Sequence, residues 1–209
     1  MTWDRIVVIT LRRRPDRLAA FRQRMGAAWP DGLSRLEVFP AIDGELCPKP
    51  DWFKGPPGAW GCYRSHQRIT EDSLLAGHER LLIFEDDATF RDDFPGRLER
   101  FLADLPADWG QAYLGGQHLR KPIQVSPTVV QGLNINRTHA YAVGSRTRLV
   151  ELYQHLHAGQ HWRGRHHVDH HFGRPHVRKR PAYAPAEWLC GQAAGPSDIN
   201  GKDNKERWW

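Results

Sequence analysis

Three acidic residues, Glu85-Asp86-Asp87, directly follow the apolar run Arg80–Phe84. Adjacent carboxylates repel one another, and a divalent cation is one way in which proteins neutralise such a group. Oxygen ligands suit Mg²⁺ or Mn²⁺, and either ion can also bind the phosphates of a substrate. The alternative is that these acids precede a helix near Phe90, because Asp and Glu are favoured at helix N-termini. The triplet alone leaves both possibilities open.

A second chemical group is the run Arg12-Arg13-Arg14-Pro15-Asp16-Arg17, which follows the apolar run Arg5–Leu11. Pro15 suits the first turn of a helix, so backbone amides and guanidinium groups would together form an anion site. Arginines that bind anions, close to acids that bind a metal, are what a nucleotide diphosphate requires. For one or two of these arginines, the alternative is a solvent-exposed helix start.

The elements that must position these side chains alternate in type along the chain. Apolar runs predict strands, and apolar residues at helical spacing predict helices between them. We therefore expect an α/β fold with a mostly parallel central sheet flanked by helices, with both groups at the carboxyl end of the strands. The predicted strands are Arg5–Leu11, Leu36–Ile42, Arg80–Phe84, Gln111–Gly116, Thr128–Ile135 and His139–Val143, and the predicted helices are Pro15–Gly26, Ala59–Leu75, Phe94–Leu105 and Thr147–His157.

Length and composition indicate one globular domain spanning residues 1–209. The chain is 40% hydrophobic and 26% charged, which excludes a wholly disordered protein. Three cysteines are too few for a disulfide framework and are expected to be reduced. No apolar run is long enough to span a membrane. The first residues leave no room for a signal peptide, so we expect a cytoplasmic protein.

The charge of the chain points to anionic partners. The formal net charge is +6, and only six of the 30 basic residues are lysine, so arginine dominates. The guanidinium fork matches phosphate and carboxylate geometry better than an ammonium group does. The basic excess is concentrated in a His- and Arg-rich segment at about 160–183, in which Trp162, Phe172 and Tyr183 are interleaved. A polar C-terminal tail, 195–209, follows it.

The histidines of this segment allow a second interpretation. His166, His167, His170 and His171 form two i,i+4 pairs, which on a helix could bind a transition metal. The neighbouring Arg and Lys side chains would repel a cation and attract a polyanion. We therefore favour a basic acceptor surface over a metal site in this segment.

Short motifs in a fixed order make the chain resemble glycosyltransferase family 25, which includes lipooligosaccharide galactosyltransferases and the collagen galactosyltransferase domain. A Gly-Cys-x-x-Ser-His block followed about 20 residues later by hydrophobic-Glu-Asp-Asp is the specific part of the pattern. The matching pieces are Val8–Leu11 with Arg13, Asp16 and Arg17; Ala41–Gly44; Gly61–His66; Leu82–Ala88; Thr138–Tyr141; Val168-Asp169; Gly191-Gln192; and Ser197–Ile199.

The resemblance implies a GT-A-type nucleotide-sugar transferase that uses a UDP-sugar donor and Mn²⁺ or Mg²⁺. It makes Asp87 the direct metal ligand and places Glu85 near the ribose or a metal-bound water. Thr10 stands where the family usually has asparagine, so the first loop departs from the family pattern there. The other residues that the resemblance places around the donor are Thr10, Leu11, Arg13, Arg17, Asp43, Ser65, His66 and Asp86.

Sugar transfer with inversion also needs a group that removes the proton of the acceptor hydroxyl. Asp169 is our candidate base, because it matches the Val-Asp element of the family late in the chain. The alternative is an acid that only balances the neighbouring arginines. His139 is a second candidate base, although a histidine in a strand is more often part of the core.

The acceptor is expected to be anionic. Basic groups interleaved with aromatic rings favour a nucleic acid, for example a hydroxymethylated DNA base, which would have to be flipped or single-stranded. Phosphorylated lipopolysaccharide core is the alternative acceptor. Two other classes of function remain open: a non-enzymatic nucleic-acid-binding module, and a metal-dependent nuclease that uses the acidic triplet and the histidines.

Overall fold

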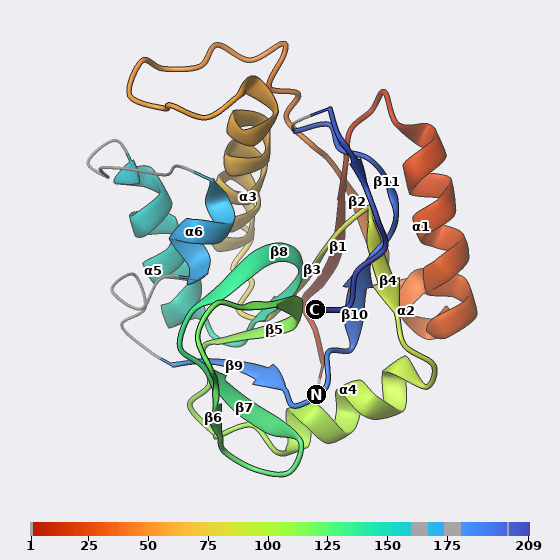
Figure 1. Cartoon of the computed structure of the whole chain (residues 1–209). Coiled ribbons are helices and arrows are strands. Elements are labelled where there is room, and N and C mark those ends of the chain that lie inside the picture. Colours follow the sequence, from red (N-terminus) through yellow and green to blue (C-terminus); the bar gives the residue numbers. More distant parts are fainter. Residues whose placement is uncertain (1, 160–166, 174–180, 200) are drawn as a thin grey trace.

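Figure 1 shows the computed structural model of the chain, which describes residues 2–159, 167–173, 181–199 and 201–209. Its helices are α1 (Pro15–Ala28), α2 (Pro30–Ser34), α3 (Pro57–Leu75), α4 (Phe94–Ala103), α5 (Arg146–His157) and α6 (Val168–Gly173). Its strands are β1 (Arg5–Thr10), β2 (Leu36–Pro40), β3 (Leu81–Glu85), β4 (Ala88–Phe90), β5 (Gln111–His118), β6 (Ile123–Gln124), β7 (Val129–Gly132), β8 (Ile135–Val143), β9 (Ala182–Pro185), β10 (Cys190–Gln192), β11 (Gly195–Pro196) and β12 (Asp203–Asn204).

A large sheet forms the centre of the molecule, with the strand order β2-β1-β3-β8-β5-β9-β7-β6 in the described residues. β1 pairs in parallel with both β2 and β3, and β5 pairs in parallel with β9. Strands β7 and β8 run opposite to the rest of the sheet. Most strands thus share one direction, and the predicted α/β class with a mostly parallel central sheet is confirmed.

Helices cover both faces of this sheet (Figure 1), with α3, α5 and α6 on one side and α1, α2 and α4 on the other. The sequence of β1 explains this layering, because alternate residues of a strand point to opposite faces. Val7 and Ile9 belong to the core under α3, whereas Ile6 and Val8 belong to the core under α1 and α4. A strand that is buried on both faces has a continuous run of apolar residues in its sequence.

Two element boundaries differ from the prediction. Helix α1 continues past Gly26 to Ala28 and ends before Pro30, because a residue that precedes proline disfavours the helical conformation. The predicted strand Thr128–Ile135 is two strands, since β7 ends at Gly132 and β8 begins at Ile135. Leu133 and Asn134 form a bend between the two strands, which run in the same direction, so the chain moves to another place in the sheet without reversing.

The acidic triplet does not start a helix. Glu85 is the last residue of β3, and Asp86 and Asp87 form a turn that leads into the short strand β4. Helix α4 begins only at Phe94, so the helix-cap interpretation of the triplet was wrong. β4 pairs instead with β10, from the C-terminal part of the chain.

The polar tail contributes more structure than its composition predicts. β11 pairs with β12, and an isolated bridge joins Gln192 to Arg207. These pairings return the tail to the sheet edge where β1 and β3 end. Among the described residues, no helix has the length and apolar character needed to cross a membrane.

Candidate functional site

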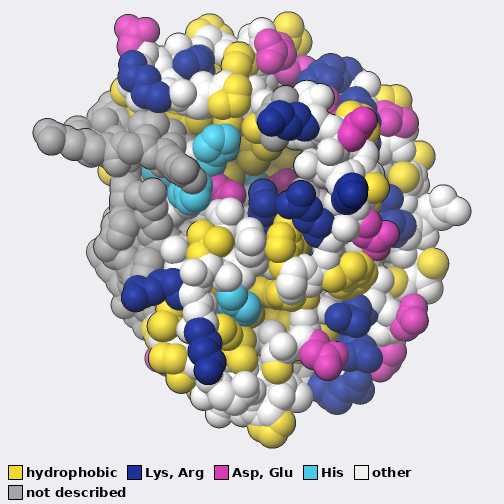
Figure 2. All heavy atoms as spheres, in the orientation of Figure 1, with side chains coloured by type: hydrophobic (Ala, Val, Ile, Leu, Met, Phe, Trp, Pro, Cys, Tyr) yellow, Lys and Arg dark blue, Asp and Glu magenta, His cyan; other side chains and the backbone are white. Residues whose placement is uncertain are grey.

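A cleft opens at the carboxyl ends of β1 and β3, where the loop after β1, helix α3 and the tail meet. With the open space at its mouth included, the cleft has a volume of about 750 Å³. Figure 2 shows acidic side chains deep in a hollow near the centre of this face, with basic side chains and histidines around it. The sequence-predicted donor residues that line this cleft are Thr10, Leu11, Arg13, Arg17, Asp43, Ser65, His66, Glu85, Asp86 and Asp87.

Asp86 is the most deeply placed acid of the triplet. Its Oδ2 accepts a hydrogen bond from Thr10 Oγ1 at 2.7 Å, and its Oδ1 lies 2.5 Å from an Nη atom of Arg17. Burial raises the pKa of Asp86 to about 6, and the charges of Asp87 and Glu85 add to that effect against the opposing charge of Arg17. Asp86 therefore anchors the turn through Thr10 and Arg17, although it also lines the cleft.

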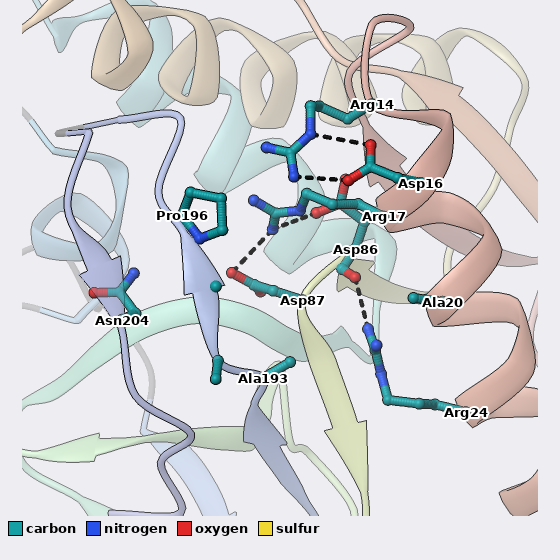
Figure 3. Close-up of a pocket in the computed structure, with 12 residues that line it drawn as sticks. Arg14, Asp16, Arg17, Ala20, Arg24, Asp86, Asp87, Ala193, Pro196 and Asn204 are labelled. Atoms are coloured by element: carbon teal, nitrogen blue, oxygen red, sulfur yellow. Dashed lines mark hydrogen bonds and ion pairs between the residues drawn. The ribbon is translucent and has the colours of Figure 1, made fainter.

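Asp87 turns toward the open side of the same turn (Figure 3). Its Oδ2 accepts a hydrogen bond from Gln192 Nε2 at 2.9 Å and lies 3.1 Å from Arg17 Nη2. Its Oδ1 is buried and has no hydrogen-bond partner. A buried carboxylate oxygen without a donor is costly unless a ligand or cation meets it.

Three arginines converge on one carboxylate from the tail. Asp198 pairs with Arg13 at 2.6 Å, with Arg14 at 2.7 Å and with Arg17 at 3.3 Å. These arginines come from the loop after β1 and the first turn of α1, and Asp198 lies just after β11. The arrangement shows that the guanidinium groups can surround one anionic group beside the acidic triplet.

Glu85 contacts a different set of side chains. Its Oε1 accepts a hydrogen bond from Thr138 Oγ1 at 2.6 Å and lies 3.3 Å from His66 Nε2. His66 Nδ1 lies 2.9 Å from the hydroxyl of Tyr141. Burial acts to raise the pKa of Glu85, but the hydrogen bond and charge of His66, with the bond from Thr138, hold that pKa below its usual range.

Asp43 and Ser65 hold the loop that forms the far wall of the cleft. Asp43 Oδ2 lies 2.7 Å from Arg13 Nε, and this bond lowers the pKa of Asp43. Ser65 Oγ donates to the carbonyl of Gly61 and accepts from the amide of Ile42, which fixes α3 against the chain after β2. Ser65 thus has a structural role as well as a place on the cleft wall.

A second pocket adjoins the first and contains the predicted base. It shares Cys62, Glu85 and Gln192 with the donor cleft, and Asp169 in the first turn of α6 lines it. His139 also lines this pocket and is 1% exposed. Burial lowers the pKa of His139, which disfavours the protonated form of its imidazole. Both candidate bases therefore lie in the pocket next to Glu85.

Two arginines, Arg137 and Arg207, line this second pocket together with mostly uncharged residues. The guanidinium of Arg137 lies 5.0 Å from the ring centroid of Trp209, and its backbone φ is 85°. A side chain other than glycine in that left-handed region is strained, and such strain often accompanies a functional position. The pocket thus pairs an acid with groups that attract an anion.

The two histidine pairs considered from the sequence lie only partly within the described residues. His166 lies outside the described residues, as does most of the basic segment. His171 Nδ1 is 2.9 Å from His155 Nε2 on α5, and His171 is buried against Tyr63. His167 instead lines the second pocket, so the i,i+4 pair of His167 and His171 is not a metal site in the part of the chain described.

A divalent cation fits the residues around Asp87. The unpartnered Oδ1 of Asp87 is a hard oxygen of the kind that Mg²⁺ and Mn²⁺ bind, and Gln192 orients the same carboxylate. Asp86 is already engaged by Thr10 and Arg17. The ion therefore has one protein ligand here that no other group engages, and the substrate would have to supply others.

Sequence reasoning gave no role to three residues that the structure brings to the site. They are Asp198 on the arginines, Gln192 on Asp87 and Thr138 on Glu85. Each belongs to one of the short motifs that carried the family resemblance, which was the signal available. Nothing in the sequence showed that they contact the loop after β1 or the triplet, because each is more than 50 residues distant from its partner.

Comparison with known proteins identifies the family. The model described as "Glycosyltransferase family 25 (LPS biosynthesis protein)" matches residues 4–120, more than half of the chain, including β1, α3 and the acidic triplet. The chain belongs to glycosyltransferase family 25. The family resemblance predicted from the motifs is thereby confirmed.

Relatives of two kinds carry the family name. Human "Inactive glycosyltransferase 25 family member 3" is 38% identical over 155 residues, which cover 63% of this chain and 24% of that protein. Mouse "Procollagen galactosyltransferase 2" is 27% identical over 152 residues, which cover 62% and 24%. The chain thus matches about a quarter of the length of these curated relatives. A solved mannose-1-phosphate geranyltransferase from Thermus thermophilus aligns over 86% of this chain and 72% of that chain, with 12% identity and a TM-score of 0.45.

Proposed function

We propose that this family 25 protein transfers a sugar from a UDP-sugar to a hydroxyl group of an anionic acceptor, with a divalent metal ion at Asp87. The observation that carries the proposal is the contact of Arg17 with the acidic triplet in one cleft, where Arg17 also joins Arg13 and Arg14 in pairing with Asp198. The second pocket, with Asp169, opens beside Glu85 and supplies a place for the acceptor.

The donor site follows from the charges in the cleft. Arg13, Arg14 and Arg17 surround Asp198, and a diphosphate could replace that carboxylate as their partner because guanidinium groups bind both. Asp43 and His66 line the same cleft, and the nucleoside is proposed to bind against them. Glu85 then lies between the nucleoside side and the second pocket.

A metal ion bound at Asp87 would supply positive charge to the diphosphate as it leaves. Asp87 Oδ1 would hold it, and Gln192 would keep the carboxylate in place through its bond to Oδ2. Arg17 contributes a fixed positive charge to the same region. Mn²⁺ and Mg²⁺ both suit these oxygen ligands.

The acceptor hydroxyl would lose its proton to Asp169, with His139 as the other base in the same pocket. Attack from this pocket, on the side of the sugar opposite to the leaving diphosphate, would invert the anomeric centre. Arg137 and Arg207 would orient an anionic group of the acceptor. The basic lining therefore supports an anionic acceptor, as the composition does.

The two acceptors expected from the sequence differ in their support. The DNA interpretation depended on the basic segment at about 160–183, most of which lies outside the described residues. The family description names lipopolysaccharide biosynthesis, and relatives are named for procollagen. We therefore propose a phosphorylated saccharide acceptor first, with a hydroxymethylated DNA base as the second candidate.

Donor binding is the first test. We expect Mn²⁺ and a UDP-sugar together to raise the melting temperature, because a ligand that binds only the folded state stabilises it by mass action. The screen should include UDP-glucose, UDP-galactose and UDP-N-acetylglucosamine, each with and without Mn²⁺. Asp87→Asn should abolish the Mn²⁺-dependent part of the shift, whereas Asp92→Asn, an exposed acid nearby, should keep it.

Transfer itself is the second test. Asp169→Asn should keep the donor-dependent shift and lose transfer to a lipopolysaccharide core acceptor, whereas His139→Asn should keep measurable transfer. Transfer only to hydroxymethylated DNA would replace the saccharide acceptor with the second candidate. Donor binding without transfer to any acceptor would place this chain with the relatives that are named inactive. No donor shift at all would refute the proposed function.

A further inference from the structure

Three side chains of different types face one another where the two pockets meet. Cys62, His66 and Glu85 place one sulfur, one ring nitrogen and one carboxylate oxygen within 4.8 Å of one another. Among the described residues they form the group in which such metal-ligand atoms gather most closely. Cys62 and Glu85 line both pockets, so this group lies at their junction.

The local structure explains why these side chains meet. Cys62 and His66 are four residues apart on α3, and residues at that spacing lie on the same face of a helix. Glu85 comes from the end of β3, which packs beside this face. Two ligands from one helical turn and a third from a strand end are a stable scaffold for a metal ion, since both elements are fixed by the core.

Two of the three side chains are already oriented by a neighbour. The Tyr141 hydroxyl lies 2.9 Å from His66 Nδ1, which leaves Nε2 directed at Glu85. Thr138 Oγ1 donates to Glu85 Oε1 at 2.6 Å. Metal-binding histidines and carboxylates commonly have such outer partners, which set the ring orientation and fix the carboxylate.

From this geometry we infer that Cys62, His66 and Glu85 form a binding site for Zn²⁺, distinct from the cation site at Asp87. A thiolate and an imidazole select Zn²⁺ over Mn²⁺ or Mg²⁺, which prefer oxygen ligands alone. Three protein ligands leave the fourth tetrahedral position open toward the cleft. Tetrahedral coordination needs ligand atoms about 3.5 Å apart. His66 Nε2 and Glu85 Oε1 already lie 3.3 Å apart, and the Cys62 sulfur lies within 4.8 Å of the other ligand atoms.

The consequence for the protein concerns the junction of the two pockets. An ion at this place occupies Glu85 and narrows the passage between the proposed donor and acceptor sites. Zn²⁺ is therefore expected to inhibit transfer while Mn²⁺ supports it. This consequence rests on the proposed function, whereas the binding of the ion does not.

Cobalt spectroscopy tests the site without any assay of activity. Co²⁺ replaces Zn²⁺ in such sites, and a bond to thiolate gives a charge-transfer band in the near ultraviolet that histidine and carboxylate ligands do not produce. We expect this band when Co²⁺ alone is added to the reduced full-length protein, and we expect Zn²⁺ to remove it. The histidine-rich segment can bind cobalt too, but it contains no cysteine.

Variants then assign the band to its ligands. Cys62→Ser should abolish it, whereas Cys47→Ser, at a partly exposed cysteine outside the group, should keep it. His66→Gln should weaken Co²⁺ binding strongly, and Tyr141→Phe should weaken it by about 10-fold, as loss of an outer partner does. Asp87→Asn should keep the band and lose only the Mn²⁺-dependent donor shift, which separates the two metal sites.

The outcomes are distinguishable from those of the donor test. No thiolate band in the wild-type protein, or a band that persists in Cys62→Ser, would overturn the inference. Either result would leave the donor proposal standing if the UDP-sugar shift is present. Conversely, a Cys62-dependent band in a protein that binds no UDP-sugar would establish the Zn²⁺ site and refute the transferase function alone.

Discussion

Glu85 and Asp86 are neighbours in the chain, yet the fold moves their pKa values in opposite directions. Glu85 meets His66 and Thr138, whose hydrogen bonds and charge outweigh its burial and lower its pKa. Asp86 is enclosed by β1 and α1, and its burial outweighs the ion pair with Arg17, so its pKa rises to about 6. Adjacent carboxyl groups with such different pKa values have different tasks, and Asp86 has the structural one.

This difference predicts a pH effect on stability at the residue scale. The pKa of Asp86 rises from 3.8 to about 6 on folding, so its contribution to stability is full below about pH 4 and is lost as pH rises through 6. The substitution Asp86→Asn removes this loss of stability as pH rises. The free energy of unfolding of the variant minus that of wild type should therefore grow by about 2 kcal/mol between pH 4 and pH 7.

Urea denaturation of both proteins across that range measures this difference. A constant offset between them is expected in addition, because asparagine replaces one carboxylate oxygen that pairs with Arg17 or Thr10. The prediction concerns only the slope with pH. Two curves that stay parallel from pH 4 to pH 7 would show that Asp86 titrates normally in the folded protein.

At the scale of elements, helix α3 and the tail lie very close together. One position of the helix therefore has no room for a side chain. A Cβ atom added at Gly58, in the first turn of α3, would lie 2.4 Å from the carbonyl oxygen of Asp198 and 2.9 Å from Cα of Ile199. Both are backbone atoms, so the tail itself must move. This contact determines where the Asp198 carboxylate meets the arginines.

Gly58→Ala is therefore expected to weaken UDP-sugar binding on the order of 10-fold, about 1.4 kcal/mol, while the core stays folded. The shift of the 197–199 segment would pull Asp198 and Ser197 out of the cleft wall. Gly26→Ala is the matched control, because its added Cβ meets only the flexible side-chain end of Leu33 at 3.1 Å. Isothermal titration with UDP-galactose and Mn²⁺ compares the two; equal affinities would contradict the prediction.

At the scale of the whole molecule, the core and the site are built by different parts of the chain. The buried members of both hydrophobic clusters lie at or before Cys190, whereas Ser197, Asp198, Ile199 and Asn204 complete the wall of the cleft. The tail thus adds to a core that is already complete. Trp209 extends the tail toward the second pocket. The centroid of the Trp209 ring lies 5.4 Å from that of the His139 ring.

A chain that ends at Ala194 is expected to keep the α/β core with a lower melting temperature and to lose the donor-dependent thermal shift. Trp209→Ala is the matched control: it should keep the donor shift and lower transfer, since Trp209 contacts His139 and Arg137 rather than the arginine cluster. Circular dichroism checks the fold of both variants. A truncated chain that still responds to UDP-sugar and Mn²⁺ would show that the tail is dispensable for the donor site.

The sequence by itself determined the elements whose pattern is local. The double-sided burial of Arg5–Thr10 and Leu81–Glu85 and the helical spacing of the residues in α1, α3 and α5 depend only on near neighbours in the chain. The end of β3 placed the acidic triplet at the carboxyl edge of the sheet. The short motifs then indicated the family, because their order along the chain can be recognised without knowing which residues are in contact.

Only the tertiary structure decided which side chain of each motif makes which contact. Asp198 reaches Arg13 across 185 residues, and the tail strands β10, β11 and β12 are too short and polar to be seen in a periodicity. Likewise, Cys62 and His66 meet Glu85 only because α3 packs on the sheet beside β3. Contacts between distant segments depend on packing that no local pattern encodes, so the division of the triplet into an anchored Asp86 and an open Asp87 could not be foreseen.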